Sequence, residues 1–179
     1  MDTPYSVLSA VLAVIIDHFE ACDRTPAKSF VSVGGAIVDD CCTGTLIVTA
    51  ERIYRTTSPF PTEAVADDTC NTHVVAINVL ATIARCMPTI DSKGNAPKPA
   101  AQEAAAAAAY IDSAILWRAL NSANMLADDE WERASVNVTF GAEQGACITI
   151  EGRMTLGINQ SGWCLECPPA APEPPPEDE

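Results

Sequence analysis

The chain has 179 residues, of which 48% are hydrophobic, and this is enough for one core of ordinary size because domains most often run to roughly 100–150 residues. Its 24 acidic residues against 10 basic ones give a formal net charge of −14, which disfavours a phosphate-neutralising surface and therefore specific nucleic-acid binding. The apolar run Val11 to Ile16 follows no basic residue and is far shorter than the ~20 residues of a membrane span, so we expect a soluble protein made in the cytoplasm, without export signal or membrane helix.

The first elements are one helix and one strand. Thr3 supplies a capping hydroxyl ahead of Pro4, and apolar residues then recur at helical spacing, which predicts a helix over about residues 4–22. Residues 29–39 predict a strand that a pair of glycines interrupts. No Gly-Lys-Ser/Thr follows that pair, so a bulge or a turn is predicted there and not a phosphate loop.

Two longer strands are predicted next, over residues 45–55 and 72–86. The first is rich in β-branched residues. The second alternates between an oily and a mixed set of side chains, as a half-buried strand does; the oily set is Val75, Ile77, Val79, Ala81 and Ile83. Residues 56–71 between them are too many for a hairpin turn and predict an arm that reaches a neighbour.

The stretch from Cys86 to Asn121 combines a polar loop with a long helix. The loop, Ser92 to Pro99, is rich in Pro, Lys and Gly, and the helix predicted over residues 100–120 carries six consecutive alanines near its start. Small side chains let another element approach closely, so this layout favours a subunit that packs against copies of itself.

A hairpin of strands is predicted over residues 135–140 and 146–157, and a tail follows it. The element order predicts an α+β fold, with an antiparallel sheet of about five strands covered on one face by two main helices. Residues 1–160 are expected to form the single domain. Residues 161–179, rich in Pro and Glu, are expected to be an extended, disordered acidic tail.

Eight cysteines are many for a cytoplasmic protein of this size. Cys164 and Cys167 have the spacing of half a redox or zinc site, but no second CxxC or CxxH is present, so we expect no metal and no cofactor. If strands 45–55 and 72–86 are antiparallel neighbours, Cys41 or Cys42 comes close to Cys86. A disulfide of Cys42 with Cys86 would then form in an oxidising environment, such as a released particle, with reduced thiols packed in the sheet as the alternative.

Catalysis is not predicted. The two histidines, His18 and His73, are isolated, and Cys70 with His73 is a poor nucleophile pair because residues three apart in an extended segment project to opposite faces. The three tryptophans favour core or interface anchors over a base-stacking platform, since no basic patch surrounds them; they are Trp117, Trp131 and Trp163.

Three segments resemble proteins that tailed phages of actinobacteria encode among their head-to-tail connection genes. They are Cys42 to Tyr54, the run Arg85-Cys86-Met87-Pro88, and the loop and helix from Pro97 to Leu120, and the resemblance extends over most of residues 17–157. The order of elements is similar to that of the tail terminator of long-tailed phages. That subunit has an α+β fold and forms a hexameric ring that caps the tail tube.

The resemblance implies a structural virion protein and not an enzyme. Such a ring stops tube polymerisation and joins the tail to the neck, and its expected partners are copies of itself, the tail tube protein, and the stopper or adaptor of the neck. DNA would pass through the lumen without specific binding. The alternatives are a head-to-tail stopper or adaptor and, from another class, a zinc-binding protein directed at the host.

Overall fold

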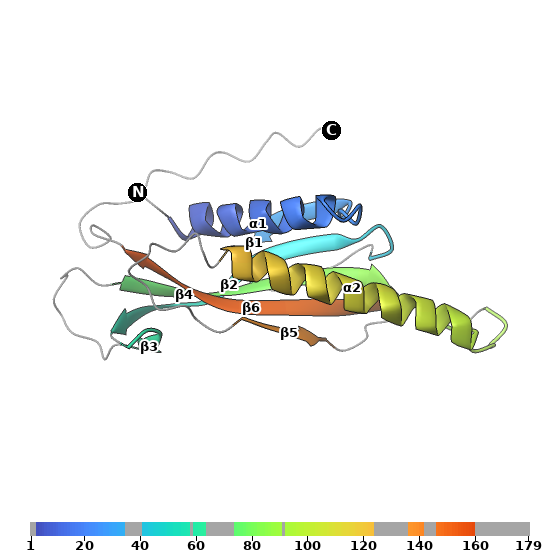
Figure 1. Cartoon of the computed structure of the whole chain (residues 1–179). Coiled ribbons are helices and arrows are strands. Elements are labelled where there is room, and N and C mark those ends of the chain that lie inside the picture. The colour runs from blue at the N-terminus through green and yellow to red at the C-terminus, as the bar shows by residue number, and fades with distance from the viewer. Residues whose placement is uncertain are drawn as a thin grey trace, which may run out of the picture.

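In a computed structural model, the chain folds as an α+β protein in which two helices lie on one face of a sheet (Figure 1). The structure describes residues 3–34, 41–57, 59–63, 74–90, 92–123, 136–141 and 146–159. No helix in these ranges combines the length and the apolar character of a membrane span.

Helix α1, Pro4–Glu20, begins as the sequence predicts. The Thr3 hydroxyl accepts a hydrogen bond from the Ser6 backbone N–H, and the Ser6 hydroxyl in turn accepts one from the Thr3 N–H, so the two residues cap the first turn. One side of the helix is buried, at a spacing of three and four residues: Leu8, Val11, Ile15 and Phe19.

The sheet contains, within the described ranges, six strands in the order β1-β2-β4-β6-β5, with β3 paired to β2. Their bounds are Lys28–Ser32 for β1, Thr45–Thr57 for β2, Thr62–Glu63 for β3, Val74–Cys86 for β4, Asn137–Phe140 for β5 and Cys147–Asn159 for β6. The three long central strands are antiparallel neighbours. The expected α+β architecture is thus confirmed.

Two details of the sheet differ from the prediction. Strand β1 pairs with β2 in parallel, because both strands start at the same end of the sheet, with Lys28 opposite Thr45. The sheet is therefore mixed and not wholly antiparallel. Strand β3 lies in the segment expected to be an arm. It folds back onto the end of β2, where Arg52 and Glu63 form an ion pair at 2.5 Å and the Tyr54 hydroxyl donates to the Pro61 carbonyl.

Helix α2, Pro99–Ala123, crosses the same sheet face and packs against α1. Its buried side contains Ala109, Asp112, Ile115, Leu116, Ala119, Leu120 and Ala123. Ile111 is half exposed, whereas the carboxylate of its neighbour Asp112 is fully buried. His18 of α1 lies 3.1 Å from the Ser122 hydroxyl of α2 and links the two helices.

The core lies between the helices and the facing residues of β2, β4 and β6. On β4 these residues are the predicted oily set, of which Ile77, Val79, Ala81 and Ile83 are fully buried. Gly152 of β6 faces α2 so closely that an added Cβ would lie 2.4 Å from Leu120 Cδ1. The other sheet face carries a mixture of polar, small and apolar side chains, among them Ile47 and Leu80, and Arg153 pairs there with Glu51 and Glu151.

Several predictions concern residues outside the described ranges. They are the second half of the strand expected over residues 29–39, most of the arm at residues 56–71, and the tail at residues 161–179.

Candidate functional site

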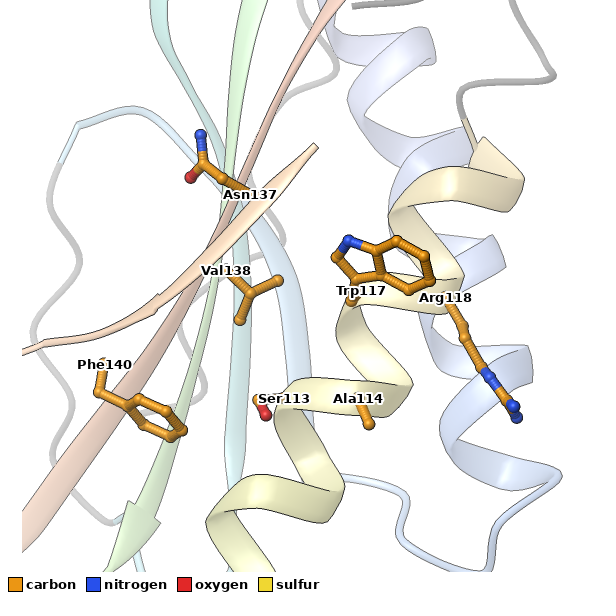
Figure 2. Close-up of a pocket in the computed structure, with 7 residues that line it drawn as sticks. All are labelled: Ser113, Ala114, Trp117, Arg118, Asn137, Val138 and Phe140. Carbon is orange, nitrogen blue, oxygen red and sulfur yellow. The ribbon is translucent and has the colours of Figure 1, made fainter. Parts of the chain in front are cut away.

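A groove runs between α2 and the edge strand β5. Ser113, Ala114, Trp117 and Arg118 of α2 line it from one side, and Asn137, Val138 and Phe140 of β5 from the other. Figure 2 shows Val138 and Ser113 between the two elements, whereas Arg118 points away from β5. The groove has a volume of about 490 Å³ and is open to solvent.

The groove is rich in aromatic surface. Trp117 is 51% exposed and Phe140 is 43% exposed, and Tyr110 meets the Phe140 ring edge-on with centroids 5.2 Å apart. Among the described residues, β5 pairs only with β6, so its other edge adjoins the groove. Aromatic side chains beside an open strand edge are typical of surfaces that bind protein.

A second surface is the projection that we define as residues 92–108, the loop before α2 and its first turns. None of the described side chains in this stretch is buried, and the N-terminal part of α2 runs past the ends of the strands (Figure 1). Ala101, Ala104 and Ala107 are exposed on it. An exposed alanine surface allows another element to approach closely, so the projection is a second candidate contact.

A buried ion cluster fixes α2 against the end of the sheet. The Asp112 carboxylate, which is 0% exposed, accepts from Arg24 Nε at 2.5 Å and from Arg85 Nε at 2.8 Å. Each arginine also donates a second hydrogen bond, Arg24 to the Ala108 carbonyl and Arg85 to the Arg24 carbonyl. The hydrogen bond with Asp112 raises the pKa of Arg24 above its already high ordinary value, so its charge persists at any pH at which the protein is handled.

This cluster also explains Gly44 at the start of β2. Gly44 has φ +83, and an added Cβ would lie against the Arg85 guanidinium, so a side chain is excluded there on both grounds. The cluster was not foreseen from the sequence. The only signal was an acidic residue at a position that helical spacing puts on the buried side of α2.

Four cysteines meet at the end of the sheet where β2 and β6 begin and β4 ends. Of the two partners that antiparallel β2 and β4 offered to Cys86, the structure joins Cys42 to it, and it joins Cys41 to Cys147. Their Cα atoms are 4.4 and 5.8 Å apart, within the usual range for a disulfide. Cys86 and Cys147 are opposite residues of β4 and β6, which brings the two pairs together.

The remaining candidates from the sequence are dispersed or lie outside the described residues. Cys22 is exposed and unbridged. Cys70, His73, Cys164 and Cys167 are outside the described ranges, as are Trp131 and Trp163. Trp117 is not a core residue, since half of it is exposed in the groove.

Comparison with known proteins gives no family for this chain: no protein-family model matches it, and no curated protein matches it significantly.

Proposed function

We propose that this chain is a structural virion subunit that assembles with copies of itself into a ring, the tail terminator at the head-proximal end of a phage tail tube. The observation that carries the proposal is the pair of unlike surfaces on one chain, the projection and the groove. A head-to-tail contact between two different surfaces generates a closed ring when its rotation closes.

We propose that the projection of one copy packs into the groove of the next. The exposed alanines allow the helix to come close to the aromatic side chains, which supply the apolar contact area. The exposed Glu103 on the helical part of the projection and the exposed Arg118 at the groove have opposite charges and can pair in this contact.

The resemblance of three segments to phage connection proteins supports the placement in the neck. The mixed α+β architecture fits a terminator better than a stopper or an adaptor, since those are mainly β-barrels and mainly helical, respectively. In this role the ring would end tube polymerisation and join tail to neck.

The self-association can be tested with charge and truncation variants. Ala104→Arg adds a bulky charge to the projection, and Ala10→Arg makes the same change at an exposed position of α1. We expect Ala104→Arg to give folded monomers by light scattering and circular dichroism, while Ala10→Arg assembles normally.

Trp117→Ala should weaken assembly by about 2 kcal/mol, or roughly thirtyfold in Kd, against no change for Tyr5→Ala.

Assembly that survives both Ala104→Arg and Trp117→Ala would contradict the proposed contact. The role in the tail has its own test, because a ring could serve elsewhere. A reconstruction of the virion neck should contain density for this chain between the tail tube and the head connector, and its absence there would exclude the terminator, whatever the oligomeric state.

A further inference from the structure

The four cysteines at the end of the sheet form a compact sulfur cluster, which we define as Cys41, Cys42, Cys86 and Cys147. The Sγ atoms of Cys41, Cys42 and Cys86 all lie within 4.8 Å of one another. Cys147 Sγ is bonded to Cys41 Sγ, which places the fourth sulfur beside this group of three. Three sulfurs this close, with a fourth bonded to one of them, approach the arrangement of a tetrahedral metal site, in which Zn–S bonds of about 2.3 Å put sulfurs roughly 3.8 Å apart.

Strand pairing holds this arrangement together independently of the disulfides. Cys86 and Cys147 are the last opposite pair in a continuous β4–β6 register, and the β2–β4 register begins at Thr45 opposite Ala84. Cys41 and Cys42 precede β2 by a turn that the Gly44 N–H closes on the Cys41 carbonyl. Reduction of the two bridges therefore leaves four thiols at one end of the sheet: two in the turn before β2, one at the end of β4 and one at the start of β6.

The chemistry of such a cluster depends on its oxidation state. Disulfides persist in oxidising environments and are rare where cellular thiols keep cysteines reduced. A reduced cluster of four thiols offers only soft ligands, and four thiolates in tetrahedral arrangement select zinc or iron over the hard cations. Cys41 is almost fully buried and Cys147 is half buried, so water has limited access to two of the four sulfurs.

We propose that the reduced chain binds one Zn²⁺ through the thiolates of Cys41, Cys42, Cys86 and Cys147. The ion ties the start of β2 to the end of β4 and the start of β6, in place of the two disulfides. Binding releases the thiol protons to solvent. The site uses neither the spaced pair Cys164 and Cys167 nor the surfaces assigned to self-association, so it does not depend on the proposed function.

Oxidation exchanges the metal for the two bridges. The oxidant is a small-molecule disulfide, of which two molecules are consumed. One cluster thiolate attacks each molecule and expels its first thiolate, and a second cluster thiolate then closes the protein disulfide and expels the other. The expelled thiolates take up protons. The four electrons lost by the cluster reduce two small-molecule disulfides to four thiols, and the Zn²⁺ is released unchanged in charge.

The test uses the full-length chain with its other four cysteines changed to serine, at positions 22, 70, 164 and 167, purified with a phosphine reductant. We expect one zinc per chain by elemental analysis, and ligand-field absorption of tetrahedral thiolate coordination when Co²⁺ is added. Adding Cys42→Ser to this background should weaken metal binding by more than about 100-fold, since even residues that only support ligands account for 10–100-fold.

Thermal unfolding checks that the background chain and its Cys42→Ser variant are both folded when their metal affinities are compared. A chelator should lower the unfolding midpoint of the reduced background chain and leave that of the oxidised chain unchanged. A small-molecule disulfide should release the zinc while peptide mapping finds Cys41 joined to Cys147 and Cys42 to Cys86. The proposal is overturned if the reduced chain is folded and takes up neither zinc nor cobalt, or if Cys42→Ser leaves the affinity unchanged.

Discussion

At the scale of single residues, the buried Asp112 carboxylate connects three separate parts of the chain. Its two oxygens accept from two arginines that lie 88 and 27 residues away in the sequence. A buried charge is tolerated only when it is paired and hydrogen-bonded, and here both oxygens are satisfied. Arg24 lies in the connection before β1, and Arg85 is near the end of β4, so one carboxylate ties α2 both to that connection and to the sheet.

Replacing this carboxylate by an amide should destabilise the protein strongly. Asp112→Asn removes the charge but nearly keeps the shape, leaving Arg24 and Arg85 facing each other without a counter-ion. We expect a loss of about 3–5 kcal/mol in the free energy of unfolding by urea denaturation. The same acid-to-amide change at the exposed Glu103 of α2 should alter it by less than about 0.5 kcal/mol. Equal effects of the two changes would mean that the cluster does not hold the helix.

At the scale of elements, α2 has two different parts. Its second half, from Ala109, is packed on the sheet and on α1, whereas its first turns contain no buried side chain. The packed half comes close to β6 because Gly152 has no Cβ: one built there would lie 2.4 Å from Leu120 Cδ1 and 2.9 Å from Leu116 Cδ2. The strand therefore has a glycine where the helix crosses it.

Adding a methyl group at this crossing should push the helix away from the sheet. Gly152→Ala is expected to lower the free energy of unfolding by about 1–3 kcal/mol, the usual range for overpacking a core. Leu120→Ala by itself leaves a cavity and destabilises as well, but it removes the nearest atom. In a double-mutant cycle, the effect of Gly152→Ala should therefore be smaller in the Leu120→Ala background. Strictly additive effects would show that the two residues do not compete for space.

At the scale of the whole molecule, the net charge bears on how the proposed ring would meet DNA. A formal charge of −14 per chain is multiplied in a ring, and like charges repel a duplex over the ~8–10 Å that salt leaves unscreened at physiological strength. A ring through which a duplex must slide needs a wall that does not bind it. Of the ten basic residues of the chain, Arg24, Arg85 and Arg153 are already paired with carboxylates of the same chain.

Duplex DNA should consequently show no measurable affinity for the protein, even at low salt where electrostatic attraction is strongest. Fluorescence anisotropy of a labelled duplex measures this directly, with a basic DNA-binding protein as the positive control. A complex whose affinity falls steeply as salt rises would reveal a phosphate-binding surface. That result would contradict a non-binding lumen and revive nucleic-acid binding as the function.

The sequence determined the elements that depend on local patterns. The Thr3-Pro4 cap, the alternation along β4 and the long alanine-rich helix are set by residues close in the chain, and the structure has all three. The closeness of Cys41 or Cys42 to Cys86 followed from one assumption, that two long strands are antiparallel neighbours, and the structure pairs Cys42 with Cys86. The edge groove had a weaker signal: Trp117 was expected in a core or an interface, and periodicity does not tell these apart.

Tertiary structure alone decided the rest, because it depends on contacts between residues far apart in the chain. The parallel pairing of β1 and the return of β3 onto β2 reflect the path of loops, which no period encodes. Asp112 meets Arg24 and Arg85 only when α2 crosses the sheet, and the sequence shows three unrelated charges. Cys147 joins Cys41 because β6 lies next to β4, and only that strand order gathers four sulfurs at one end of the sheet.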